Sequence, residues 1–290
     1  MSDYMIVDVF TGAPLEGNPL AVFTDARGVP GEWMQRVARE MNLSETVFVL
    51  PPEQGGDARI RIFTPVDELP FAGHPTLGSA YVLCGQRGLD AIDLETGLGV
   101  IRVDFAAKNG QAPTGQPGLP HPPALPGRMR QPVPTWEPYE RAAELLAALG
   151  VDSSQLPVEA YRNGPRHVYV ALDSEDAVRA LQPDFTALGK LPGIGICCFA
   201  GSGSRWKSRC FVPALGVPED PATGSAAGPL AVHLARHGQI AFGQEIEIRQ
   251  GAEIGRPSLL LALAEGTSDK VTGVEVAGSA VLVARGEFLA

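Results

Sequence analysis

The sequence of 290 residues contains little that points to membranes, nucleic acids or secretion. No apolar run approaches the roughly 20 residues that span a bilayer, and no basic region precedes an apolar one near Met1. We therefore expect neither a membrane segment nor a signal peptide. Lys and Arg number 23 against 33 Asp and Glu, and the net charge of −10 argues against a nucleic-acid partner.

The sequence also lacks the usual patterns of cofactor and metal sites. The 4 cysteines have no zinc spacing, and we expect them to be reduced and mostly buried in a cytoplasmic protein. His233 and His237 have i,i+4 spacing, but His-Leu-Ala-Arg-His lacks the glutamate of a zinc-protease helix, so we expect no metal. No dinucleotide fingerprint follows the first expected strand, and Gly224–Gly228 is not a nucleophile elbow.

Two apolar helices with glycine-flanked starts are the strongest features that are present. The first is expected to run from Pro75 to Leu83, with Gly85 as its C-terminal cap. It carries no charged residue, a pattern typical of a buried helix. The second follows Asp220-Pro221 and is expected to end at Gly238. The first N–H groups of a helix lie at its positive dipole end, so each start is a candidate anion site.

The similarity of these two stretches predicts a chain of two similar halves. Gly224-Ser225 corresponds to Gly73-His74, and strand patterns surround each helix, which indicates a duplicated α+β unit. A run rich in proline and glycine at 113–134 predicts a connection between an N-terminal half, 1–112, and a C-terminal half, 135–279. We expect both helix starts to face one pocket between the halves.

Four polar residues stand beside these features. Glu45 lies where a turn enters an apolar strand; it is either a solvated carboxylate or a half-buried one with a raised pKa, suited to proton transfer. His74 is a cap, a hydrogen-bond donor to substrate or a second acid/base. Asp220, before a proline, either caps the second helix or orients or accepts a proton. Asn18 is a turn residue or a polar contact.

Together, motifs spread over nearly the whole chain resemble those of the PhzF-like phenazine-biosynthesis family, relatives of the diaminopimelate epimerase fold, and they occur in that family's order. The matching stretches are Asp8-Val9-Phe10-Thr11, Gly17-Asn18-Pro19-Leu20-Ala21-Val22, Asn42-Leu43-Ser44-Glu45-Thr46, Phe63-Thr64-Pro65, Glu68-Leu69, Phe71-Ala72-Gly73-His74-Pro75-Thr76, Glu219-Asp220-Pro221-Ala222-Thr223-Gly224-Ser225-Ala226 and Gly255-Arg256-Pro257-Ser258.

The resemblance implies an α+β fold of two similar halves, each a mixed β-sheet or barrel wrapped around a central buried helix, with the C-terminal strand, about 280–290, returning to the first half. It also implies a cofactor-free isomerase that forms homodimers; the best-known activity isomerises a dihydro-hydroxyanthranilate. Glu45 then has the role of general acid/base, assisted by His74 and Asp220. The implied substrate-binding residues are Asn18, Gly73, Thr223, Gly224 and Ser225.

We therefore predict an isomerase that moves a proton on a small anionic, carboxylated metabolite. Two alternatives remain open: a non-catalytic metabolite- or partner-binding protein on the same fold, and an epimerase or dehydratase of a small amino acid. The presence of Glu45, His74 and Asp220 together favours a catalyst. Neither helix start carries a cysteine, so racemisation by two thiols is not expected.

Overall fold

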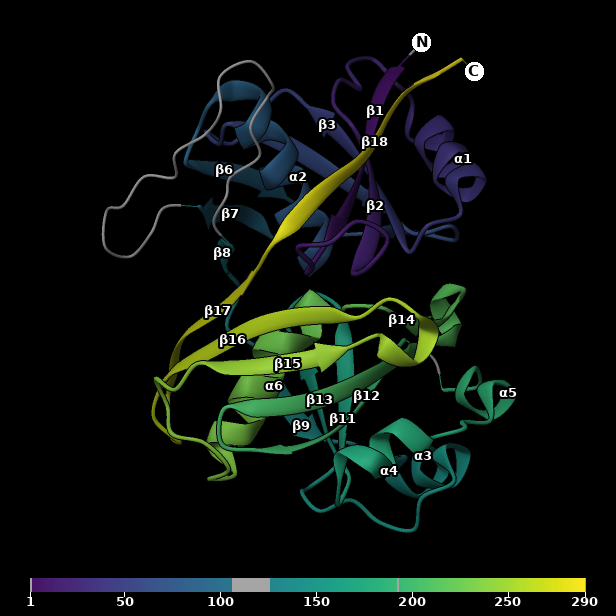
Figure 1. Ribbon diagram of the computed structural model, residues 1–290, viewed down its shortest axis with the longest axis vertical. Helices are drawn as coiled ribbons and strands as arrows, with labels where there is room; N and C mark the ends of the chain where they lie inside the picture. Colours follow the sequence, from purple (N-terminus) through teal and green to yellow (C-terminus); the bar gives the residue numbers. More distant parts are fainter. Residues whose placement is uncertain (1, 106–125, 192, 290) are drawn as a thin grey trace. The chain divides into compact units, whose positions relative to one another are not determined.

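The computed structural model describes residues 2–105, 126–191 and 193–289, and the chain divides into two compact units. Unit 1 comprises residues 1–130 and 277–290, and unit 2 comprises residues 131–276. Figure 1 shows that strands surround one long helix in each unit, α2 in unit 1 and α6 in unit 2. No helix of the described residues is long and apolar enough to cross a membrane.

Unit 1 is a mixed sheet with two helices. Its elements are β1 (Ser2–Val9), β2 (Asn18–Phe23), α1 (Gly31–Met41), β3 (Glu45–Leu50), β4 (Ala58–Phe63), β5 (Glu68–Leu69), α2 (Gly73–Arg87), β6 (Ala91–Thr96), β7 (Gly99–Asp104), β8 (Gly127–Arg130) and β18 (Ala280–Phe288). β1 pairs antiparallel with β18 and β2, and β3 runs parallel to β2. β4 pairs antiparallel with β3 and β5 and parallel with β6, and β7 pairs antiparallel with β6 and β8.

Helix α2 is buried because it offers no charged face to water. Every residue from Gly73 to Cys84 is buried, and the first charge comes at Arg87 in the last turn. Gly78 allows the helix to lie close to β1 and β2, because a Cβ atom there would be only 2.6 Å from a methyl of Leu20 and 2.8 Å from one of Val9. Such close packing fixes the start of α2 against the first strands of the unit.

Helix α1 packs against residues of β2 and β3 that include two stacked phenylalanines. Phe23 and Phe48 lie with their ring centroids 4.9 Å apart and share a core with Met34 and Val37 of α1. Successive side chains of a strand point to opposite faces, so the next residue of β2, Val22, lies on the other face and is also fully buried. β2 is therefore an inner strand, covered on both sides.

Unit 2 repeats this plan with more helices. Its elements are β9 (Thr135–Pro138), α3 (Ala142–Leu149), β10 (Glu159–Arg162), β11 (Arg166–Ala171), α4 (Glu175–Ala180), α5 (Phe185–Leu188), β12 (Gly195–Ser202), β13 (Arg205–Val212), the 3₁₀ turn Pro213–Leu215, β14 (Val217–Asp220), α6 (Gly224–Arg236), β15 (Ile246–Gln250), the 3₁₀ turn Ala252–Ile254, β16 (Ser258–Gly266) and β17 (Val271–Gly278), of which Ala277 and Gly278 belong to unit 1. β11 runs parallel to β12, as β2 does to β3.

Helix α6 is the buried helix of unit 2, and every residue from Gly224 to Ala235 is buried. Helices α3, α4 and α5 contribute to a second core, in which Leu145, Val178 and Leu188 meet apolar residues of β11 and β12. Both buried helices that the sequence predicted are confirmed. All 4 cysteines are buried and none forms a disulfide, which also agrees with the prediction.

Several predicted helix boundaries are wrong, for local reasons. α2 continues past Gly85 because Gln86 and Arg87 are good helix formers, and Gly88, with φ of 66°, is the left-handed cap. α6 begins at Gly224 with Thr223 as its N-cap. Asp220 is instead the last residue of β14, so it is not the helix cap that the sequence suggested.

The predicted connection at 113–134 is partly outside the described residues, which resume at 126. The remainder of this stretch contains a strand, β8, Gly127–Arg130, which the expected connection did not include. Met129 of β8 is fully buried and pairs with Val103 of β7. A strand can form here because no proline interrupts the chain between Pro126 and Pro132.

Candidate active site

Three polar residues that the sequence singled out lie together at the start of α2 in unit 1. Asn18 is the first residue of β2, Glu45 is the first residue of β3, and His74 is the second residue of α2. β2 and β3 run parallel, with Leu20 opposite Glu45. Parallel neighbours begin at the same edge of a sheet, and α2 packs on both strands. The fold of unit 1 alone therefore assembles this group.

Polar contacts link the three side chains through the imidazole of His74. The amide nitrogen of Asn18 lies 3.2 Å from Nδ1 of His74, and Nε2 of His74 lies 3.4 Å from Oε2 of Glu45. An amide nitrogen only donates hydrogen bonds, so Nδ1 accepts and the proton of the neutral ring lies on Nε2. The Nε2–H group is then the part of His74 that faces the Glu45 carboxylate.

Burial keeps His74 uncharged. The side chain is 3% exposed, and burial lowers its pKa from 6.5 to about 3. At neutral pH the ring is thus a hydrogen-bond donor and carries no positive charge. The side chain of Glu45 is 14% exposed, so the alternative of a fully solvated carboxylate is wrong. A carboxylate beside a neutral donor can take and return a proton.

The starts of both buried helices leave backbone N–H groups available for an anion. The N-cap residues, Ala72 of α2 and Thr223 of α6, make no cap hydrogen bond with their own side chains, and Gly73 and Gly224 are the first residues of the two helices. The N–H groups of a first helical turn have no intrahelical partner, and they favour negative charge.

In unit 2, Gln250 of β15 connects the predicted residues Asp220 and Thr223. The Thr223 hydroxyl donates to Oδ2 of Asp220 over 2.6 Å. The Gln250 amide nitrogen donates to the Asp220 carbonyl over 2.8 Å and to the Thr223 hydroxyl over 2.9 Å. This network fixes the turn that leads from β14 into α6, and Gln250 was not predicted.

Ser225, the second residue of α6, contacts a buried histidine from β11. Nε2 of His167 lies 3.1 Å from the Ser225 hydroxyl, and both residues are buried. Burial lowers the pKa of His167 to about 4, so its ring is neutral at pH 7. His167 was also missed; the sequence signal was a lone histidine in an otherwise apolar strand.

Two further side-chain contacts hold the first turn of α6, and a proline inside the helix explains one of them. Pro229 has no N–H, so it cannot donate to the carbonyl of Ser225, four residues earlier. The side-chain amide of Asn163 donates to that carbonyl instead, over 3.1 Å. Gln131 donates to the Gly224 carbonyl over 2.8 Å. Neighbouring side chains thus hold Gly224 and Ser225 in place.

The structure therefore brings together two groups of predicted residues, one in each unit. Asn18, Gly73 and His74 stand with Glu45 in unit 1, and Asp220, Thr223, Gly224 and Ser225 form a second group in unit 2. Their participation in one pocket stays a prediction. One further cluster has metal-ligand spacing among the described residues: Glu159, His233 and His237 of unit 2.

A family model described as "Phenazine biosynthesis-like protein" (PhzC-PhzF) matches residues 7–286. The chain is similar to a trans-2,3-dihydro-3-hydroxyanthranilate isomerase of Pseudomonas fluorescens, with 55% identity over 289 residues and 100% of both chains covered. It is also similar to the protein of the same name from Pseudomonas aeruginosa, with 54% identity and 99% of both chains covered. The predicted isomerase class agrees with the names of these relatives.

A solved structure shows the same fold. It is described as a phenazine biosynthesis protein of the PhzF family from Bacillus anthracis. The TM-score is 0.82 at 26% identity, and the match covers 100% of this chain and 99% of the other. The predicted fold class, two similar α+β halves each built around a central helix, is confirmed.

Proposed function

Because the chain belongs to the phenazine biosynthesis-like family, we propose that it is an isomerase that moves a proton on a small carboxylated metabolite without a cofactor. The substrate class we propose is dihydro-hydroxyanthranilate-like, after the compound named for the Pseudomonas relatives. In this proposal the Glu45 carboxylate takes a proton from one carbon and returns it to another on the same face of the molecule.

The contact between Glu45 and a neutral His74 is the observation that carries the proposal. A positively charged imidazole would stabilise the carboxylate as an ion pair and make it a weaker base. Burial prevents that charge, since it lowers the pKa of His74 to about 3. His74 therefore places an uncharged N–H group beside Glu45, and the sequence-based alternative of a second acid/base is not part of the proposal.

The unit 2 group is assigned to the same reaction as a binding site for negative charge. The N–H groups at the starts of α2 and α6, with the Ser225 hydroxyl, bind the substrate carboxylate and the charge that develops when the proton leaves. Asp220 orients or accepts a proton, and its hydrogen bond from Thr223 fixes its carboxylate. Asn18 contributes by holding the imidazole of His74.

Proton exchange followed by NMR tests the role of Glu45. The protein is incubated in D₂O with trans-2,3-dihydro-3-hydroxyanthranilate and with a panel of carboxylated metabolites. We expect deuterium at one carbon of the product with the wild type. Glu45→Gln keeps the shape of the side chain and removes the base, so the rate should fall by about 10²–10⁴-fold while binding persists.

Glu40→Gln is the matched control, because Glu40 is an exposed glutamate of α1. It should exchange deuterium at the wild-type rate. Full activity of Glu45→Gln would refute the assignment of the base. Binding shifts without exchange for any compound would favour the non-catalytic alternative, and exchange only with small amino acids would favour the epimerase or dehydratase.

We also propose that the protein works as a homodimer in the cytoplasm, as the family resemblance implies. A net charge of −10 is compatible with a small-molecule enzyme that has no nucleic-acid partner. Light scattering coupled to gel filtration should give twice the chain mass of 30.5 kDa, and a mass of one chain would contradict the dimer.

A further inference from the structure

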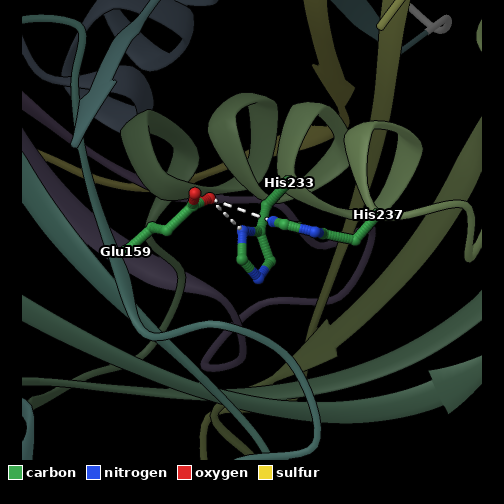
Figure 2. Close-up of side chains that lie close together, drawn as sticks. All are labelled: Glu159, His233 and His237. Atoms are coloured by element: carbon green, nitrogen blue, oxygen red, sulfur yellow. Dashed lines mark hydrogen bonds and ion pairs between the residues drawn. The ribbon is translucent and has the colours of Figure 1, made fainter. Parts of the chain in front are cut away.

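The end of α6 carries two histidines that face a glutamate from a different part of unit 2. His233 is in the last turn of α6, His237 follows the helix, and Glu159 is the first residue of β10. Figure 2 shows both imidazoles directed toward the same side of the Glu159 carboxylate. Oε2 of Glu159 lies 3.3 Å from Nδ1 of His233 and 3.1 Å from Nε2 of His237.

We propose that Glu159, His233 and His237 bind a divalent transition-metal ion of the zinc type, with the Tyr161 hydroxyl as a fourth ligand. Imidazole nitrogen and carboxylate oxygen are ordinary zinc ligands. Four tetrahedral ligands at the usual zinc distances lie roughly 3.3 Å from one another. The two contacts to Glu159 are close to that spacing, and the Tyr161 oxygen lies 3.2 Å from Nδ1 of His233.

The hydrogen-bonding capacity of Glu159 leaves at least one imidazole of the cluster with a lone pair available to a metal ion. Besides the two imidazoles, the Tyr161 hydroxyl lies 2.9 Å and an Arg236 nitrogen 2.8 Å from the same oxygen, Oε2. One carboxylate oxygen has about two lone-pair sites. Arg236 always donates to one of them, so at most one of the two imidazoles donates a proton to Oε2. Imidazole nitrogens that present lone pairs toward this point fit the arrangement, and lone pairs are what a metal requires.

Arg236 is the internal cation with which the metal competes. Its guanidinium bonds to Glu159 and also lies 4.2 Å from the ring centroid of Trp136. The stack on Trp136 can retain the guanidinium after it leaves the carboxylate. The side chains of Arg236 and His237 are 16% and 20% exposed, which gives the ion a path from solvent on this side of the cluster.

The proposed site has a structural role. With Tyr161 as the fourth ligand the coordination is closed, as in structural zinc sites. The ion would tie β10 to the end of α6. His233 is nine residues beyond Gly224, and at 1.5 Å per residue this places it about 13 Å along the helix from the start that we assign to substrate binding. The metal is therefore not part of the proton transfer, and this inference does not depend on the proposed reaction.

Cobalt titration of the untagged, chelator-treated full chain tests the site. We expect one Co²⁺ per chain, with the intense visible bands of a four-coordinate ion, displacement of Co²⁺ by Zn²⁺, and a rise in Tm with zinc. His237→Gln removes a partly exposed ligand and should weaken binding at least about 100-fold, the upper end of what loss of an outer-shell partner costs. Arg236→Gln removes the competing positive charge and should tighten binding relative to the wild type.

His74→Gln is the matched control, because it removes a buried histidine of unit 1 and should bind Co²⁺ as the wild type does. Equal affinity of the wild type and His237→Gln would place the metal elsewhere and overturn the proposal. Binding by Arg236→Gln but not by the wild type would overturn it as well, since Arg236 would then be the permanent cation of the cluster. If Glu159→Gln fails to fold, His237→Gln still decides the question.

Discussion

The starts of α2 and α6 are built on one backbone plan with different side chains. In unit 1, Phe63 lies opposite Thr46 on one side and Glu68 on the other; in unit 2, Phe211 lies opposite Ile196 and Glu219. The chain then takes the same number of residues from Glu68 to His74 as from Glu219 to Ser225. Between Glu68 and His74, unit 1 therefore has the same length as unit 2 has between Glu219 and Ser225.

This register places Gly195 where unit 1 has Glu45. A Cβ atom on Gly195 would lie 2.5 Å from Nδ1 of His167, so in unit 2 the imidazole of His167 occupies the space into which a larger side chain would extend. In the same register, Leu69 of unit 1 is equivalent to Asp220 of unit 2. Each unit therefore has a candidate site carboxylate, Glu45 in unit 1 and Asp220 in unit 2, and the two are not at equivalent positions.

Duplication of the fold has not duplicated the arrangement of polar side chains at the helix starts. The histidine beside the helix start comes from the helix in unit 1, as His74, and from a strand in unit 2, as His167. In unit 1 the histidine faces a carboxylate, and in unit 2 it faces the Ser225 hydroxyl. We infer that proton transfer belongs to unit 1 and that recognition of negative charge belongs mainly to unit 2.

The largest expected difference concerns an ion pair that both units share. Arg61 pairs with Glu68 while both side chains are at least 30% exposed, whereas Arg209 pairs with Glu219 at 9% and 6% exposure. Glu219→Gln leaves a buried guanidinium uncompensated and should cost about 3–5 kcal/mol of unfolding free energy. Glu68→Gln should cost about 0–1 kcal/mol. Urea denaturation of both variants measures the contrast.

The exposed pair is the internal control for the buried one, because each arginine also lies over a phenylalanine ring, Phe63 at 5.0 Å and Phe211 at 5.1 Å. Cation–π contact is thus matched between the units and cannot explain a difference. Equal losses of unfolding free energy in the two variants would show that burial of the unit 2 pair does not determine its contribution to stability.

The buried helices could be predicted from the sequence because their signal is local. A run without charge and with glycine near its start is sufficient to indicate burial. The starts were displaced by a few residues: α2 begins at Gly73, before the expected Pro75, and α6 begins at Gly224, after the expected Pro221. The C-terminal end of α2 could not be predicted from the same local signal. Gly85 and Gly88 both resemble caps in the sequence, and only the backbone shows that Gly88 adopts the left-handed conformation.

Residues of the site could be predicted where they lie in a recognisable stretch, as Glu45, His74 and Asp220 do. Their partners could not, because they come from distant strands and have no local pattern. Gln250 is 27 residues from Thr223, and His167 is 58 residues from Ser225. Glu159 and His233 are 74 residues apart, which explains why the spacing of the two histidines alone did not predict their contact with this glutamate.

A smaller effect is expected at Gly195, where the two units diverge. Gly195→Ala forces a methyl group against the His167 ring, and such overpacking costs about 1–3 kcal/mol. It should also displace His167 from Ser225 and raise KM more than it lowers kcat. Thermal unfolding and steady-state kinetics measure the two effects, with Gly12→Ala as the control, because no atom lies within 4 Å of a Cβ there.

The double variant Gly195→Ala/His167→Ala separates this clash from a general loss of packing. If His167 is the group that the new methyl meets, adding Gly195→Ala to His167→Ala should cost clearly less than adding it to the wild type, because residues in contact are not additive. Additive losses would show that the other near neighbour, Val212 at 3.1 Å, dominates the clash.

The third effect, the smallest when counted per pH unit, is a pH dependence that both units share. Burial lowers the pKa of His74 to about 3 and of His167 to about 4, from 6.5. The unfolded chain therefore binds more protons than the folded one below pH 6.5, and the stability of the neutral rings is lost as pH falls. Between the unfolded-state pKa and its own folded-state pKa, each ring changes the unfolding free energy by about 1.4 kcal/mol per pH unit.

The two windows distinguish the units. His167→Gln should flatten the dependence of unfolding free energy on pH between about pH 6 and pH 4. His74→Gln should flatten it over the same range and also from pH 4 down to about pH 3, because its folded-state pKa is lower. Urea denaturation at half-unit pH intervals measures both slopes. An unchanged slope in His74→Gln would mean that the ring is already protonated in the folded protein, and the Glu45 contact would then be an ion pair that does not suit a base.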